Sequence, residues 1–217
     1  MKPLDPVATL LVYKDYLVQR HPLHKLEETR DPWAIVASVI LSGNTTDAAE
    51  NKVMDGFLAR YPTPASIRGA TRDEVIPLLP GIAHNGSKTD YLKNIAEVLV
   101  ERGMPDTMEA LTAVTGIGRK TAAIVLYRVH GKDLGFPLDT HCLRVLDRLG
   151  WYPEARKPKS LEKALLTDFP EGTRHASHLI LTHHGRTVCQ ALKPACDGCK
   201  LRAFCTYGQS SAQGALP

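Results

Sequence analysis

The chain has 217 residues and a mass of 23.8 kDa, which is enough for one large or two small domains with a buried core. Hydrophobic residues make up 43% and charged residues 23%, so a collagen-like, coiled-coil or wholly disordered chain is excluded. There are 27 basic and 23 acidic residues, and the net charge of +4 permits a polyanionic partner without requiring one.

The N-terminal segment carries charges that argue against secretion. Asp5, Lys14 and Asp15 interrupt its apolar residues, whereas a signal peptide needs an unbroken apolar region. The longest uncharged apolar stretch, 33–41, is far shorter than the ~20 residues that cross a bilayer. The sequence therefore predicts an intracellular protein without a membrane role.

Apolar residues recur at helical spacing along most of the chain. Residues 121–130 are also β-branched enough that periodicity alone leaves a strand open there. Asp47 followed by Glu50 predicts a capping-box start for one helix, and the small polar tail, 206–217, is expected to be disordered. The sequence predicts an all-α fold with helices over 7–18, 33–41, 47–61, 64–69, 72–78, 88–100, 107–114, 121–130, 140–149, 160–168 and 174–184.

Four of the five cysteines crowd into one segment: Cys189, Cys196, Cys199 and Cys205. Four thiolates in so short a loop can surround a [4Fe–4S] cluster. One close pair with two flanking single residues favours a cluster over zinc, which usually takes two separated pairs. Zinc stays an alternative, and a redox Cys-x-x-Cys pair is a weaker one because it leaves two cysteines unused. Cys142 stands apart and is expected to be a buried core thiol.

The segment 172–205 is locally basic, with Asp197 as its one acidic residue. Such a run is either a solvated face or a phosphate-binding platform. Its lysines and arginines are Arg174, Arg186, Lys193, Lys200 and Arg202, and its histidines are His175, His178, His183 and His184.

Two glycines surround one apolar residue in Gly116-Ile117-Gly118, and Arg119 and Lys120 follow. Glycine permits positive φ and a close backbone approach. The helix that starts here points free N–H groups and its positive dipole end outward, so a phosphate group suits this position. A helix C-cap followed by a tight turn is the structural alternative.

Lys120 is expected in the first turn of a buried helix, where the dipole disfavours a cation. An amine nucleophile needs a lowered pKa, which burial, Arg119 and the dipole together can provide. A surface lysine or a phosphate contact is the alternative. Asp139 precedes the predicted helix 140–149 and is expected to be its N-cap. A carboxylate facing a neutral amine can assist proton transfers or stabilise a cationic sugar intermediate.

Several segments together resemble one family. They are the hairpin with its lysine, LDTHCLRV at 138–145, HGRTVC at 184–189, the four-cysteine spacing and LSGNTTD at 41–47. In this combination the chain resembles the endonuclease III family, the helix–hairpin–helix DNA glycosylases with an iron–sulfur loop. The resemblance covers about residues 25–205.

The resemblance implies two all-α lobes with DNA in the cleft between them. One lobe is a helical barrel with the helix–hairpin–helix over 25–133, and the other is a discontinuous iron–sulfur domain made of 1–24 and 134–217. It also implies that the four grouped cysteines hold a structural [4Fe–4S] cluster.

The same resemblance implies a base-excision repair enzyme that removes oxidised pyrimidines from double-stranded DNA and then cuts 3′ to the abasic site. Neutral Lys120 would attack the sugar C1′ and expel the base. β-Elimination through the resulting Schiff base, assisted by Asp139, would cut the strand. We expect a monomer that is associated with DNA, in the cytoplasm or nucleoid if the source is prokaryotic.

Other positions are expected to touch DNA. Asn44 stands where the family often has a glutamine that looks placed to fill the space of a flipped nucleotide. The loop 81–88 is longer than is usual in the family, so the side chain that wedges into the duplex would be Ile82 or His84. The remaining expected contacts are Gly116, Ile117, Gly118, Arg119, Arg186 and Lys193.

Alternative functions stay open. Related mismatch glycosylases resemble the chain but lack a lysine at the position of Lys120, and they remove bases without cutting the strand. A non-catalytic DNA-binding iron–sulfur protein and an electron-transfer iron–sulfur protein are further alternatives. Neither of these requires the pair of Lys120 and Asp139, which argues against both.

Overall fold

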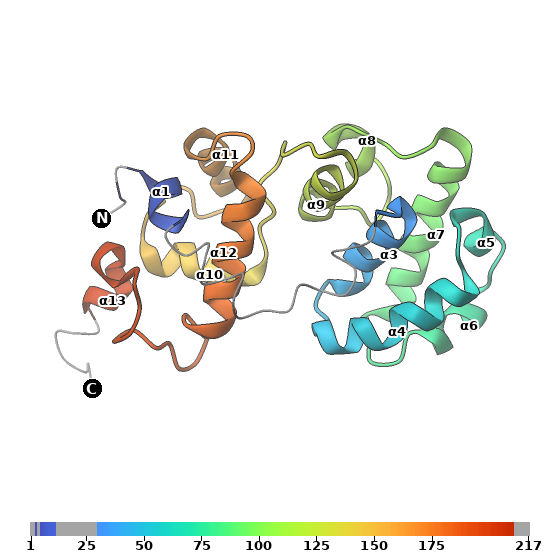
Figure 1. Ribbon diagram of the computed structural model, residues 1–217, viewed down its shortest axis with the longest axis horizontal. Coiled ribbons are helices and arrows are strands. Elements are labelled where there is room, and N and C mark those ends of the chain that lie inside the picture. Colours follow the sequence, from blue (N-terminus) through green and yellow to red (C-terminus); the bar gives the residue numbers. More distant parts are fainter. Residues whose placement is uncertain (1–2, 4, 12–29, 211–217) are drawn as a thin grey trace. The chain divides into compact units, whose positions relative to one another are not determined.

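The computed structural model describes residues 3, 5–11 and 30–210, and within them the chain is helical and has no strand (Figure 1). The all-α prediction is confirmed, and residues 121–130 lie in a helix rather than a strand. The helices in chain order are α1 (Pro6–Leu11), α3 (Pro32–Ser42), α4 (Asp47–Arg60), α5 (Pro64–Arg68), α6 (Arg72–Val75), η2 (Ile76–Leu78), α7 (Asn85–Arg102), α8 (Met108–Thr112), α9 (Arg119–His130), α10 (Thr140–Leu149), α11 (Pro158–Asp168), α12 (Arg174–Thr187), η3 (Arg202–Phe204) and α13 (Thr206–Ser210).

The chain divides into two compact units. The central unit is Pro22–Leu134, and the terminal unit combines Met1–His21 with Gly135–Pro217. Each unit has a hydrophobic core of its own. The chain therefore leaves the terminal unit after α1 and returns to it before α10.

The core of the central unit is built around α3. Asp31 caps this helix by accepting the Trp33 N–H at 3.0 Å, and Pro32 occupies its first position. Every residue from 33 to 41 is buried, as expected of a helix that is apolar on all sides. Helices α4, α7 and α9 pack against it. The hairpin helix α9 is therefore positioned by its contact with α3, which also contacts α4 and α7.

The core of the terminal unit lies between α10 and α12. Helix α1 packs on α12, and α13 packs on α10. The rings of Phe136 and Phe169 meet edge to face with centroids 5.3 Å apart. Cys142 is fully buried in this core, which confirms the prediction of a core thiol.

The predicted N-cap of α4 is wrong by one residue, although the helix itself starts at Asp47 as predicted. Its N-cap is Thr46, whose hydroxyl accepts the Ala49 N–H at 3.3 Å, and Asp47 is the first helical residue. Glu50 is buried and its carboxylate accepts the Ser38 hydroxyl at 2.5 Å, so this side chain faces the core rather than the helix end. Because Glu50 packs against α3, its side chain does not complete a capping box with Asp47.

The predicted disordered tail is wrong for residues 206–210, which form α13. The Thr206 hydroxyl donates to the Leu149 carbonyl at 3.1 Å and fixes the start of this helix against the end of α10. Residues 211–217, and residues 12–18 of the first predicted helix, lie outside the described residues. Among the described helices, none combines the length and the apolar character that a bilayer crossing needs.

Candidate functional site

The segment between α8 and α9 forms the predicted glycine hairpin. Gly116 has a φ of +96°, and a Cβ atom there would lie 2.0 Å from the Tyr91 ring of α7, so only glycine fits. The Ile117 side chain is buried, and its N–H donates to the Val114 carbonyl at 2.9 Å. Gly118 is the N-cap of α9. The hairpin therefore presents the start of α9 while Ile117 anchors it in the core.

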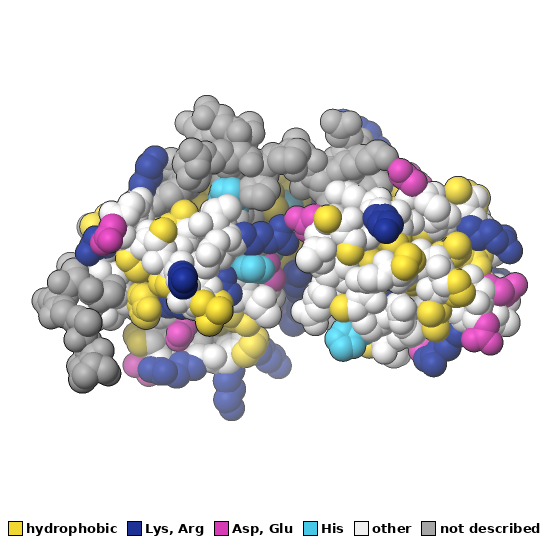
Figure 2. All heavy atoms as spheres, turned by 90° about the horizontal axis from the view of Figure 1, so that it is seen from below, with side chains coloured by type: hydrophobic (Ala, Val, Ile, Leu, Met, Phe, Trp, Pro, Cys, Tyr) yellow, Lys and Arg dark blue, Asp and Glu magenta, His cyan; other side chains and the backbone are white. Residues whose placement is uncertain are grey.

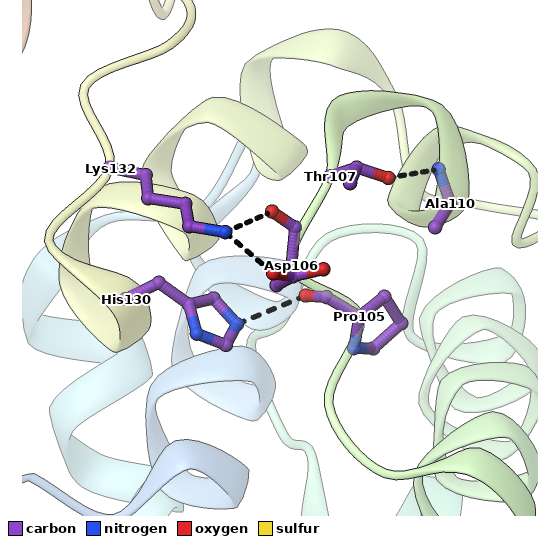
Figure 3. Close-up of polar contacts among 6 residues, drawn as sticks. All are labelled: Pro105, Asp106, Thr107, Ala110, His130 and Lys132. Atoms are coloured by element: carbon purple, nitrogen blue, oxygen red, sulfur yellow. Dashed lines mark hydrogen bonds and ion pairs between the residues drawn. The ribbon is translucent and has the colours of Figure 1, made fainter.

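The other end of α9 is tied to the segment before α8 (Figure 3). The His130 Nε2–H donates to the Pro105 carbonyl at 3.1 Å, and the Lys132 ammonium contacts the Asp106 carboxylate at 2.6 Å. The side-chain amide of Asn94 in α7 donates to the Thr115 carbonyl at 3.1 Å and so holds the loop of the hairpin. The two helices of the hairpin are thus fixed at both ends.

Lys120 lies half-buried in the first turn of α9. Lys88 of α7 is its electrostatic neighbour, and Glu50 of α4 is in turn a neighbour of Lys88. Burial lowers the pKa of Lys88 to about 8, the Glu50 carboxylate opposes that shift, and the charge of Lys120 adds to it. Lys120 therefore shares with Lys88 a positively charged part of the central unit, beside a helix N-terminus, where a phosphate suits.

Lys88 holds the loop that follows α3. Its Nζ atom donates to the Leu41 carbonyl at 2.7 Å and to the Thr45 hydroxyl at 2.9 Å. It also donates to the Gly43 carbonyl. Asn44 stands at the tip of this loop, exposed and with a φ of +52°, a conformation that asparagine tolerates better than most residues. One buried lysine therefore fixes the backbone that presents Asn44.

The loop before α7 carries the two residues expected to wedge into DNA. Ile82 is buried, with 4% of its surface exposed, whereas His84 is exposed and has a φ of +55°. The Ala83 N–H donates to the Thr45 hydroxyl at 3.3 Å, so this loop is joined to the loop of Asn44. Of the two residues, His84 is the one that the surface presents.

Asp139 is the N-cap of α10, as predicted: its Oδ1 accepts the Cys142 N–H at 2.7 Å. Its Oδ2 accepts the Thr182 hydroxyl of α12 at 2.9 Å. The Cys142 thiol and the His178 ring lie beside the carboxylate, and the ligand atoms of these three residues lie within 4.8 Å of one another. Burial raises the pKa of the Cys142 thiol far above its usual range, so this group is a neutral S–H.

The two residues expected to share the chemistry belong to different units. Lys120 is fixed in the central unit by α9, and Asp139 is fixed in the terminal unit by α10 and α12. Each side chain is half-buried and keeps part of its surface open to solvent. That the two act together stays a prediction.

All four grouped cysteines line one pocket of the terminal unit, beside Arg148 and Gly208. The Arg148 guanidinium donates to Cys189 Sγ at 3.4 Å, and the Gly208 N–H donates to Cys205 Sγ at 3.3 Å. Burial raises the pKa of the Cys199 and Cys205 thiols, so without a cation these groups hold their protons. N–H donors aimed at sulfur suit thiolates bound to a metal, and the donor set therefore fits an iron–sulfur cluster or zinc.

The histidines of the basic segment do not contribute to a basic surface. All four are buried, and burial together with the charge of His183 lowers the pKa of His184 to about 4. Arg186 and Lys193 are exposed, and on the face in Figure 2 lysine and arginine side chains are scattered over both units. The sequence interpretation groups four histidines with the basic residues of this segment, and it is wrong in this respect because their rings are buried. These residues are His175, His178, His183 and His184.

Sequence reasoning missed Lys88 and Thr182. Lys88 has a detectable signal, because it stands one turn before Leu92 and two turns before Ile95 on the buried face of α7. A lysine in that register is buried or reaches over the core. Thr182 has no comparable signal, since its partner is 43 residues earlier in the chain.

A family model described as "HhH-GPD superfamily base excision DNA repair protein" matches residues 37–171, more than half of the chain. This chain belongs to the HhH-GPD superfamily. The match spans the loop of Asn44, the hairpin, Lys120 and Asp139. It ends before the grouped cysteines.

Endonuclease III proteins from several organisms are similar in sequence to this chain over most of its length. The endonuclease III of Thermotoga maritima is 30% identical over 201 residues, which cover 91% of this chain and 92% of that protein. The endonuclease III of Sulfolobus acidocaldarius is 34% identical over 188 residues, with 83% and 84% covered. A solved structure of a trapped covalent intermediate between endonuclease III and DNA is 26% identical with a TM-score of 0.81, and covers 94% of this chain and 97% of that one.

These similarities confirm the resemblance drawn from the motifs. This member of the HhH-GPD superfamily is a base-excision repair DNA glycosylase of the endonuclease III kind. Endonuclease III proteins are DNA glycosylases with AP lyase activity and carry a [4Fe–4S] cluster as a family.

Proposed function

We propose that the protein removes oxidised pyrimidines from double-stranded DNA and cuts the strand 3′ to the abasic site by β-elimination. The observation that carries the proposal is the place of Lys120. Its amine lies in the first turn of α9, directly after the glycine hairpin and beside the buried Lys88. The covalent endonuclease III–DNA intermediate among the similar structures supports it, because such an intermediate requires a nucleophile on the protein.

The proposed reaction uses Lys120 as the nucleophile. The neutral amine bonds to C1′ of the sugar, the bond between C1′ and the base breaks, and the base leaves with the bonding electrons and takes up a proton. The sugar ring opens to a Schiff base, which acidifies the C2′ protons. Loss of one of them breaks the C3′–O bond and releases the 3′ strand as a 5′-phosphate. The Asp139 carboxylate stabilises the cationic sugar and assists the proton transfers.

The same proposal assigns the DNA contacts. The N–H groups at the start of α9, behind Gly116 and Gly118, point at a backbone phosphate, and Arg119 adds charge there. Asn44 fills the space of the flipped nucleotide, and the exposed His84 is the wedge, since Ile82 would have to leave the core. Exposed Arg186 and Lys193 bind further phosphates. The protein acts as a monomer.

The four grouped cysteines hold a [4Fe–4S] cluster in this proposal. Cys189, Cys196, Cys199 and Cys205 line one pocket, and N–H donors point at two of the sulfurs. The cluster would cross-link the loop that carries Lys193 and would play no redox part in turnover. Iron, sulfide and zinc contents with visible absorbance test this, because a protein that holds zinc alone and has no visible absorbance would contradict it.

The decisive experiment traps the covalent intermediate. Wild-type protein, Lys120→Ala and Lys52→Ala are incubated with a duplex that carries one abasic site, and borohydride is added. Lys52 is an exposed lysine of α4 and serves as the matched control. We expect adduct and strand cleavage with the wild type and the control, and DNA binding without either in Lys120→Ala. Trapping that persists in Lys120→Ala would remove Lys120 from the mechanism.

A second experiment addresses the substrate. Duplexes that contain thymine glycol, a thymine mismatch or an undamaged pair are compared for base release and for strand cleavage. The proposal expects release and cleavage together on thymine glycol. Base release without cleavage, or activity on the mismatch alone, would instead favour a monofunctional mismatch glycosylase.

A further inference from the structure

We propose that Thr182 is a positioning residue that sets the orientation of the Asp139 carboxylate for catalysis. The inference rests on the proposed function of Asp139 and extends it to a residue on another helix. Thr182 lies on α12, 43 residues after Asp139, and its hydroxyl is nearly buried.

Donors from two helices hold the two oxygens of the carboxylate. The Cys142 N–H of α10 donates to Oδ1 at 2.7 Å, and the Thr182 hydroxyl of α12 donates to Oδ2 at 2.9 Å. The first bond is an ordinary N-cap and holds Oδ1 from the same helix. The second bond holds Oδ2 from a different helix. Together they fix the plane of the carboxylate, and a reacting group must be held within about 0.5 Å of its productive position.

Neighbouring groups orient the Thr182 hydroxyl itself. Its oxygen lies 3.4 Å from Cys142 Sγ and 3.4 Å from His178 Nδ1. A hydroxyl donates one proton, and the carboxylate can only accept, so the proton of Thr182 points at Asp139. The His178 ring can then donate to a lone pair of the Thr182 oxygen, while the Cys142 thiol, which has one proton, also lies 3.7 Å from the His178 carbonyl as a donor. The Cys142 thiol is neutral and fully buried, so it places no charge beside the Thr182 oxygen.

The packing of α10 on α12 makes the contact possible. These two helices form the main helix pair of the terminal unit. A Cβ at Gly185 would lie 2.8 Å from His141 Cβ, so this glycine allows α12 to approach the first turn of α10, which follows Asp139. The close approach brings Thr182 within hydrogen-bond distance of a residue that stands outside the helix.

The test compares two substitutions at Thr182. Thr182→Val keeps the shape and removes the hydroxyl, whereas Thr182→Ser keeps the hydroxyl. Three quantities are measured on an abasic duplex: the single-turnover rate of strand cleavage, the rate of borohydride trapping, and the Kd for DNA. We expect Thr182→Val to slow both steps about tenfold, which corresponds to about 1.4 kcal/mol, with the Kd for DNA unchanged. Thr182→Ser is expected to restore the wild-type rate.

The inference would be overturned if Thr182→Val cleaved DNA at the wild-type rate. It would also be overturned if Thr182→Ser were as slow as Thr182→Val. Thr167→Val is the matched control, because the Thr167 hydroxyl is exposed and bonds to its own helix α11 at 3.2 Å. Thermal unfolding of each variant separates a loss of fold from a loss of rate.

Asp139→Asn and the double variant distinguish this inference from the proposed function. If Thr182 acts through the carboxylate, Asp139→Asn with Thr182→Val is no slower than Asp139→Asn alone. Additive losses would mean that Thr182 acts elsewhere. A wild-type rate in Asp139→Asn would overturn the proposed role of Asp139, whereas a slow Asp139→Asn beside an unaffected Thr182→Val would overturn only the positioning role.

Discussion

Lys88 donates a hydrogen bond from its Nζ atom to the carbonyl oxygen of Leu41 at 2.7 Å, and so joins α7 to the C-terminus of α3. The last carbonyl groups of a helix have no partner within the helix, and a cation there also meets the negative end of the dipole. The same ammonium bonds to Gly43 and Thr45 on either side of Asn44. The charge of a buried lysine thus completes the central helix and shapes the loop proposed to enter DNA.

Lys88→Met is expected to lower the free energy of unfolding by about 2 kcal/mol. Methionine keeps most of the volume but leaves buried carbonyl oxygens without a donor, at ~1–3 kcal/mol for each such group, and the removed cost of burying a charge offsets part of this. Urea unfolding measures the change. Lys52→Met, on the exposed face of α4, is the control and should stay within about 0.5 kcal/mol of the wild type. A Lys88→Met variant as stable as the wild type would contradict the anchoring role.

The stability conferred by Lys88 is expected to rise with pH. Its pKa is about 8 in the folded protein, against an ordinary value of 10.5, so the unfolded state holds the proton more tightly. Below pH 8 both states are protonated and the full cost of the buried ammonium is present. That cost disappears as the pH rises to 10.5. Urea unfolding between pH 8 and 10.5 should show the free energy of unfolding of the wild type rising relative to that of Lys88→Met, by at most about 1.4 kcal/mol per pH unit. A difference that shrinks with pH would contradict the burial.

Most of the fold could be predicted because the information is local. The apolar run of α3 and the capping of α10 by Asp139 follow from residues within one or two turns. The N-cap of α4 could not be predicted as well. Thr46 and Asp47 are both good caps, and the choice depends on Glu50 packing against Ser38, 12 residues away.

The candidate site divides in the same way. The grouped cysteines and the hairpin before Lys120 are contiguous motifs, so the sequence displays them. Lys88 and Thr182 act on partners 47 and 43 residues away, which only the packing of α7 on α3 and of α12 on α10 brings close. No spacing rule predicts such pairs.

Gly116→Ala is expected to destabilise the protein by about 2–3 kcal/mol and to weaken DNA binding. The residue would need a φ of +96°, which costs ~1 kcal/mol for a residue with a Cβ, and that Cβ would meet the Tyr91 ring. Thermal unfolding and DNA affinity measure the two effects. Gly118→Ala is the matched control for stability, since a Cβ there meets nothing within 4 Å and its φ of −84° is ordinary.

A double variant separates the two causes of the Gly116 effect. Tyr91→Ala removes the ring, so in that background Gly116→Ala should cost only the backbone strain, on the order of 1 kcal/mol. An equal cost of Gly116→Ala with and without the Tyr91 ring would mean that steric contact with α7 does not determine the hairpin.

Arg148→Lys is expected to loosen the loop of the grouped cysteines. The Arg148 guanidinium donates to the carbonyls of Gln190 and Ala191 at 2.7 Å each, and to Cys189 Sγ at 3.4 Å. Lysine keeps the charge but cannot present this planar set of donors. Iron retained per protein, and the rate at which visible absorbance decays with a chelator, measure the effect; we expect a decay several-fold faster than in the wild type. Arg156→Lys, on the exposed surface, should leave the rate unchanged. An unchanged rate in Arg148→Lys would show that the cysteines alone hold this loop.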